Sequence, residues 1–118
     1  MEVAKRKNSF MPIFGNDYST KDGTGIRDYV YVSDLATVHV IAIEKIKKYS
    51  KNLILNLGSE TGFSVFEILE KTKSILHVDI PYKIMKRRLG DVAEIVSSCC
   101  KAEDILNWKK TLFIGDFN

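Results

Sequence analysis

Short apolar runs alternate with two amphipathic stretches along this chain, and this alternation is the feature that most limits its possible folds. The pattern predicts strands over residues 10–14, 26–32, 52–58 and 82–85 and helices over residues 34–48 and 65–76. A short extended segment over 92–97 and a short helix over the run KAEDILNW are expected to follow. Strands that alternate with helices are typical of the α/β class.

The two longer helices carry end signals. Ser64 and Glu67 have the spacing of a capping box, in which each side chain satisfies a backbone N–H of the partner residue. The buried stripe of this helix is expected to contain Ile68, Leu69, Thr72, Ile75 and Leu76. The earlier helix is expected to take Ser33 as its N-cap and to place Asp34 near its positive end.

Residues 15–25 are rich in glycine, asparagine and aspartate, which predicts a loop with unusual backbone angles. Arg27 follows this loop directly and begins the expected strand. Functional groups often lie where a loop meets a strand in α/β proteins. Arg27 therefore has two open interpretations, a structural residue or a ligand contact.

Composition sets the broad class. The chain has 118 residues, 45% hydrophobic and 28% charged, with a net charge of +3. These values are typical of one small folded domain and do not call for a nucleic-acid partner. No apolar run approaches the roughly 18 residues that span a bilayer, and the first ten residues do not resemble a signal peptide. Cys99 and Cys100 are interpreted as reduced thiols of a cytoplasmic chain.

Several familiar chemical motifs are absent from the sequence. It contains no glycine-rich dinucleotide loop, no Walker A loop and no metal-binding cluster. His39 and His77 are interpreted as ordinary structural or solvated histidines. Tyr82 and Lys86 form a Y-x-x-x-K pattern, but on a strand two residues four apart are separated by roughly 13 Å. A catalytic role for that pair is therefore not expected.

The basic run MKRRLGD is more informative. Arg87 and Arg88 follow an expected strand, and Asp91 comes just after Gly90. Arginine binds phosphate through a planar fork of donors, and a carboxylate can accept hydrogen bonds from sugar hydroxyls. The run therefore suits a nucleotide whose ribose lies beside its phosphates. Solvated surface charges at the end of a strand remain the alternative.

Four segments together carry a resemblance to a known family. They are IFGNDYSTKDGTGIRDYVYVSDLATVHVIAIE, NLGSETGFSVFEILE, RRLGD and LNW. The chain resembles the C-terminal part of the UDP-glucose 4-epimerases, which are extended short-chain dehydrogenases, over roughly residues 2–108. The resemblance implies a substrate-binding lobe over 1–108, without the Rossmann-type lobe, and a divergent tail over 109–118.

The resemblance also implies a set of substrate-binding residues, which are Pro12, Ile13, Phe14, Arg27, Tyr29, Val65, Arg88 and Asp91. The strand over 12–14 would hold the uracil through its backbone, and Val65 would line the uridine pocket. Arg27 and Arg88 would grip the diphosphate, and Asp91 would accept the ribose hydroxyls. The tyrosine of this set would lie near the nucleotide.

The resemblance does not extend to the catalytic parts of the family. The family's NAD loop, catalytic serine or threonine, and tyrosine–lysine pair have no counterpart in these residues. Epimerisation of UDP-glucose and UDP-galactose would therefore need an N-terminal NAD-binding half, and no NAD is expected on this chain alone. Lys86 stands where the family usually has proline, and Tyr31 where histidine is common. The chain is therefore expected to be a catalytically inactive fragment of an epimerase. One alternative is a non-catalytic module that binds UDP or docks a partner, and another is an unused remnant.

Overall fold

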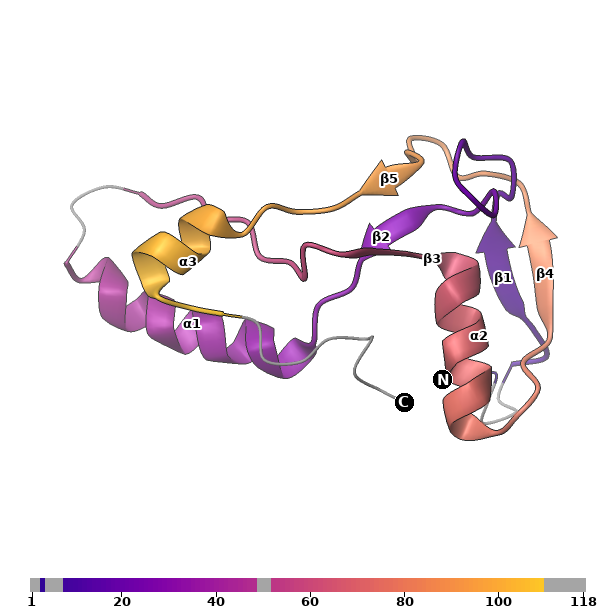
Figure 1. The fold of residues 1–118 in the computed structure, drawn as a ribbon, viewed down its shortest axis with the longest axis horizontal. Helices are drawn as coiled ribbons and strands as arrows, with labels where there is room; N and C mark the ends of the chain where they lie inside the picture. Colours follow the sequence, from indigo (N-terminus) through magenta and orange to yellow (C-terminus); the bar gives the residue numbers. More distant parts are fainter. Residues whose placement is uncertain (1–2, 4–7, 49–51, 110–118) are drawn as a thin grey trace. The chain divides into compact units, whose positions relative to one another are not determined.

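A computed structural model describes residue 3, residues 8–48 and residues 52–109 of the chain. Its elements are β1 (Met11–Phe14), β2 (Ile26–Asp28), α1 (Val32–Ile46), β3 (Gly62–Ser64), α2 (Val65–Leu76), β4 (Tyr82–Met85), β5 (Glu94–Ile95) and α3 (Cys100–Leu106) (Figure 1). The expected α/β class is confirmed, and α2 and β4 have the predicted bounds. No helix in the described part of the chain is long and apolar enough to cross a membrane.

The contacts divide the chain into two compact units. Unit 1 comprises the residues up to Arg27 together with Phe63–Ile95, and unit 2 comprises Asp28–Gly62 together with the residues from Val96 on. Each unit has its own cluster of buried apolar side chains. The length predicts one small domain with one core, whereas the described residues form two smaller ones. The divergent tail lies beyond the described residues from position 110 on, and the lobe over 1–108 stays a prediction.

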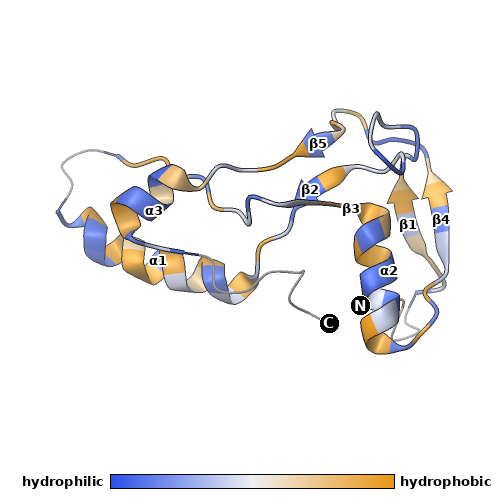
Figure 2. Ribbon diagram, in the orientation of Figure 1, coloured by the Kyte–Doolittle hydropathy of each residue, from blue (hydrophilic) through white to orange (hydrophobic). Residues whose placement is uncertain are grey.

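Unit 1 is built on a pair of parallel strands covered by α2. β1 and β4 pair in register from Met11 with Tyr82 to Phe14 with Met85. The carboxyl-terminal halves of both strands are hydrophobic (Figure 2). The buried cluster contains Ile13, Leu69 and Ile80. Because the strands are parallel, their carboxyl ends meet at the same edge, so Phe14 and the residues after Met85 lie together.

The predicted capping box of α2 is confirmed. The Ser64 hydroxyl accepts a hydrogen bond from the Glu67 N–H at 3.1 Å, and the Glu67 carboxylate accepts one from the Ser64 N–H at 2.8 Å. Leu69 is buried as expected. The predicted burial of Ile75 and Leu76 is wrong, since Ile75 is 47% exposed and Leu76 is also exposed. The early turns of α2 supply the helix's contacts with the core, so its last turn lies outside it.

β2 is much shorter than predicted. It pairs with β5 in parallel through Ile26 with Glu94 and Arg27 with Ile95, and leaves the ladder after Asp28. α1 then begins two residues early, with Tyr31 as its N-cap and no side-chain cap. The predicted Ser33 cap is therefore wrong. The Tyr31 carbonyl already accepts the N–H groups of Asp34 and Leu35, which starts the helix before Ser33.

Unit 2 packs α1 and α3 around a buried cluster that includes Val38, Ala102 and Trp108. Residues 52–58 do not form the predicted strand. Their burial alternates as it would in a strand, with leucines turned inward, but none of the described residues pairs with their backbone in a ladder. A strand is stabilised by its ladder, and alternation alone does not supply one.

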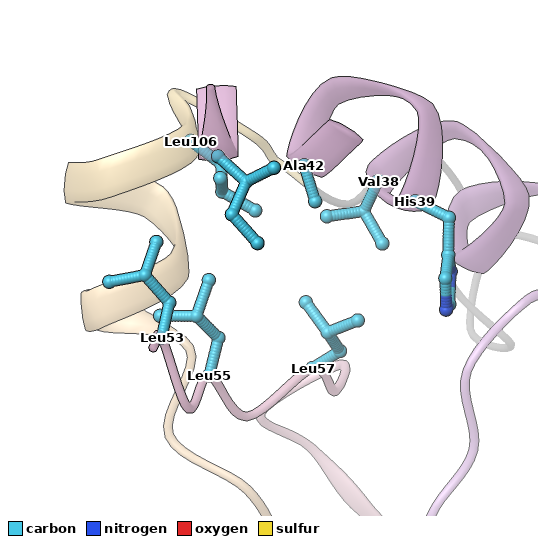
Figure 3. A pocket seen from close by; sticks show the side chains of 8 residues that line it. Val38, His39, Ala42, Leu53, Leu55, Leu57 and Leu106 are labelled. Carbon is cyan, nitrogen blue, oxygen red and sulfur yellow. The ribbon is translucent and has the colours of Figure 1, made fainter. Parts of the chain in front are cut away.

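The inward leucines line an apolar hollow with a volume of about 260 Å³. Figure 3 shows Leu57 facing Val38 of α1 across the hollow, with Leu53 and Leu55 lining the wall beside it. The wall is almost entirely aliphatic, apart from His39, whose Nδ1 lies 2.6 Å from the Leu35 carbonyl oxygen. The hollow therefore offers few polar groups to a ligand.

A carboxylate fastens the loops of unit 2. One oxygen of Asp28 accepts the N–H and the hydroxyl of Ser59, each at 2.6 Å. The other accepts the N–H of Ser97 at 3.1 Å and that of Glu60 at 3.3 Å. Burial acts to raise the pKa of Asp28, but these hydrogen bonds outweigh burial and hold the pKa below its ordinary value.

Replacing Gly23 with alanine should destabilise unit 1 more than the same change at Gly90. Both glycines have positive φ, +79° and +86°. A Cβ on Gly23 would lie 2.0 Å from the backbone oxygen of Asn16, whereas one on Gly90 would meet nothing within 4 Å. We expect a loss of about 3 kcal/mol for G23A and about 1 kcal/mol for G90A in urea unfolding. Equal losses would show that the clash does not matter.

The Asp28→Asn variant should flatten the dependence of stability on pH. Because the folded-state pKa is lowered, Asp28 contributes stability above the ordinary aspartate pKa and loses it as the pH falls below that value. Urea unfolding at pH 7 should show a loss of about 2 kcal/mol for D28N, and the variant should lose less than the wild type on acidification. Asp104→Asn, at an exposed position of α3, is the control of equal charge change. A wild-type pH profile for D28N would contradict the assignment.

Candidate functional site

The segment from Arg88 to Ala93 in unit 1 contains two predicted site residues, Arg88 and Asp91, and contacts two others, Phe14 and Arg27. This segment follows β4 and turns at Gly90, where the Asp91 N–H donates to the Arg88 carbonyl at 3.3 Å. It lies at the carboxyl edge of the parallel strands, where ligands commonly bind in α/β sheets. A hollow of about 330 Å³ opens at the same edge, lined by residues 15–17 and 85–87.

Arg88, Asp91 and Phe14 form the centre of the candidate site. The Nε of Arg88 lies 3.0 Å from a carboxylate oxygen of Asp91, and its guanidinium lies 4.8 Å from the centre of the Phe14 ring. The Arg88 side chain is 61% exposed. Among the described residues, nothing hydrogen-bonds its two Nη nitrogens. The predicted phosphate donor is therefore oriented by two neighbours while the outer side of its fork stays open.

Arg27 is anchored to the same segment by its guanidinium. It donates to the carbonyl of Val92 at 2.9 Å, to that of Ala93 at 3.5 Å, and to that of Ile26 at 2.7 Å. The side chain is half-buried. Arg27 therefore has a clear structural role, since it connects β2 to the chain just after Asp91. Its predicted contact with a diphosphate stays a prediction.

Arg87 separates from its neighbour in sequence. Its Nε lies 2.5 Å from a carboxylate oxygen of Asp17, and its guanidinium lies 4.0 Å from the centre of the Tyr18 ring. A second guanidinium nitrogen donates to the Asp17 carbonyl. No local sequence pattern indicates this arrangement, because Asp17 lies 70 residues away from Arg87. Within the basic run, the side chain of Arg87 is therefore engaged by Asp17 and Tyr18, whereas that of Arg88 is open to solvent.

The other predicted site residues differ in exposure. Pro12 is exposed on β1, whereas the Ile13 side chain is buried in the core, so only its backbone could meet a ligand. Val65 is the first residue of α2 and packs against the same core. Tyr29 is half-buried and belongs to unit 2.

Sequence analysis also missed a buried polar cluster at the loop. The Asp22 carboxylate accepts the Thr24 N–H at 2.9 Å and the Thr24 hydroxyl at 2.8 Å, and it accepts the Ser64 hydroxyl as well. Burial acts to raise the pKa of Asp22, but these hydrogen bonds lower it below its ordinary value. The spacing of Asp22 and Thr24 is the sequence signal of an Asx turn, which could have revealed half of the cluster.

The described residues offer no group of histidine, cysteine or carboxylate side chains that could hold a metal ion. They do not fit NAD either. α1 follows Tyr31 and α3 follows Cys99, and α2 starts at its capping box, so none of these helices begins at the glycine-rich turn that cradles a dinucleotide. Tyr82 lies on β4 as expected, and Lys86 follows that strand, which gives the pair no shared helix face.

Comparison with known proteins decides the family. The model of the NAD dependent epimerase/dehydratase family matches residues 4–58. The UDP-glucose 4-epimerase of Lactobacillus helveticus is 46% identical over 97 residues, which cover 82% of this chain and 29% of that protein. This chain belongs to the UDP-glucose 4-epimerase family. It spans about a third of the length of the curated relatives that it matches.

Solved structures of this family agree. The chain is similar to a UDP-glucose 4-epimerase from Bifidobacterium longum in complex with NAD+ and UDP, with 39% identity and a TM-score of 0.89. It is also similar to the enzyme from Stenotrophomonas maltophila with bound NAD and formylated UDP-arabinopyranose, with 35% identity and a TM-score of 0.90. Each match covers 98% of this chain and 34% of the other. Both of these similar structures contain NAD.

The two candidate arginines should differ in their effect on stability. Arg27→Ala removes charged hydrogen bonds to backbone carbonyls and should cost about 1–2 kcal/mol, whereas Arg88→Ala removes one exposed ion pair and should change stability by less than about 0.5 kcal/mol. Urea unfolding of the two variants beside the wild type measures this difference. A larger loss for R88A than for R27A would show that their roles have been reversed.

Proposed function

We propose that this chain is the UDP-binding part of a UDP-glucose 4-epimerase and that it does not catalyse epimerisation by itself. The observation that carries the proposal is the open fork of Arg88, held beside Phe14 and Asp91 at the carboxyl edge of β1 and β4. The family membership and the UDP in a similar structure support the choice of ligand.

Each group suits one part of UDP. The free nitrogens of Arg88 can donate to a phosphate in a forked arrangement. Among the described residues, Asp91 uses only Oδ2 in its bond with Arg88, which leaves Oδ1 to accept a ribose hydroxyl. The backbone at Pro12–Phe14 is assigned to the uracil, and Val65 is assigned to the wall of the uridine pocket. Arg27 is assigned to the diphosphate in addition to its anchoring of Val92.

Catalysis is assigned to residues that are outside these 118. When bound, NAD supplies the hydride chemistry of the epimerases, and the described residues do not fit this cofactor. The role of this chain is therefore to bind and orient the UDP moiety of UDP-glucose or UDP-galactose. An NAD-binding half is the proposed partner, supplied by the same polypeptide or by another.

Titration of UDP into the chain, with and without the NAD-binding part of a relative, tests this proposal. We expect weak or no binding by the chain alone, and binding with epimerase activity once the NAD-binding part is added. Arg88→Ala should weaken UDP binding by about tenfold or more, because a charged hydrogen-bonding pair is lost. Lys48→Ala, an exposed basic residue just after α1, is the control for loss of one positive charge and should bind like the wild type.

Other results would point elsewhere. Turnover of UDP-galactose by the chain alone with added NAD would contradict the inactive assignment. Micromolar binding of UDP by the chain alone, lost in R88A, would favour the autonomous binding module. A non-cooperative thermal melt of the chain would favour an unused remnant.

A further inference from the structure

The buried polar cluster at Asp22 joins the loop over residues 15–25 to the start of α2. Thr24 and Ser64, which donate to the Asp22 carboxylate, are both 0% exposed. The Ser64 hydroxyl also accepts the Glu67 N–H at 3.1 Å. One continuous set of hydrogen bonds therefore runs from the loop to the helix cap.

Three candidate substrate residues lie next to the parts that this cluster joins. Phe14 ends β1 just before the loop, and Arg27 lies in β2 just after it. Val65 follows Ser64 directly and begins α2. A displacement of the loop or of the helix cap would move the adjoining ends of β1, β2 and α2. The position of the cluster therefore affects all three of these residues.

Other connections between the loop and α2 are weaker. Lys21 forms an ion pair with Glu67, but the Lys21 side chain is 64% exposed, and such pairs contribute at most about 1 kcal/mol. The Phe66 N–H donates to the Thr24 hydroxyl at a long 3.4 Å, and that hydroxyl is itself held by Asp22. Among the described residues, Asp22 is thus the centre of the connection.

We propose that Asp22 is a positioning residue for the nucleotide site, an inference that rests on the function proposed above. Its carboxylate fixes the loop to the cap of α2, and so sets the positions of Arg27 and Val65 relative to each other. Within the described residues, the hydrogen bonds of the Asp22 carboxylate are with Thr24 and Ser64, and its effect on UDP passes through Arg27 and Val65. A carboxylate suits this role because its two oxygens accept three donors that would otherwise be buried without partners.

The test uses this chain combined with the NAD-binding part of a relative. Asp22→Ala should raise the Kd for UDP and the KM for UDP-galactose by about tenfold, with kcat within about twofold, since misplaced binding groups weaken affinity for substrate and transition state alike. Asp22→Asn keeps one accepting oxygen and should recover only part of the affinity, leaving a loss of about threefold. Glu70→Gln removes the same charge from an exposed position of α2 and is the control.

A double-mutant cycle with Arg27→Ala separates positioning from general destabilisation. If Asp22 acts through Arg27, the double variant should lose less UDP affinity than the sum of the single losses. Strictly additive losses, or wild-type affinity in D22A, would overturn the inference about Asp22 alone. If D22A fails to fold, D22N carries the same test. Wild-type UDP affinity in D22N, or a D22N loss that adds strictly to the R27A loss, would then overturn the inference. Failure of the wild-type complex to bind UDP would overturn the proposed function and this inference together.

Discussion

The Asp22 carboxylate shapes the part of unit 1 that contains the candidate site. Backbone hydrogen bonds within the loop, such as that from the Tyr18 N–H to the Gly23 carbonyl at 2.9 Å, shape its turns but do not join it to α2. Asp22 makes that connection by accepting from Thr24 and from the buried cap residue of α2. The strands on either side of the loop then carry Phe14 and Arg27 toward the segment that contains Arg88. Burying this cluster is favourable only because its donors and acceptors are paired.

The apolar side chains of this chain form two small cores, one in each unit. A chain of 118 residues buries limited apolar surface, and here that surface is shared between two clusters. Much apolar side chain stays exposed in unit 2, where Ile54 is 81% exposed and Val40 on α1 is also exposed. The leucines of residues 52–58 contact apolar neighbours, but in the described part of the chain their backbone has no ladder partner.

The three arginines show how far residue type predicts role. All three carry the same planar donor fork, and sequence analysis could separate them only by the resemblance to a family. In the structure, Arg87 is used by Asp17 and Tyr18, and Arg27 by backbone carbonyls. Arg88 keeps its outer nitrogens open because its neighbours, Asp91 and Phe14, hold only one side of the fork.

The sequence by itself determined the α/β class, the loop, the bounds of α2 and β4, and the Ser64–Glu67 capping box, because each depends on neighbours within a few residues. It also carried the family resemblance that selected Arg88 and Asp91. Only the tertiary structure decided the length of β2, the exposure of Ile75, and the separate roles of Arg27 and Arg87. These outcomes depend on partners as far as 70 positions away, which local periodicity and end signals do not encode.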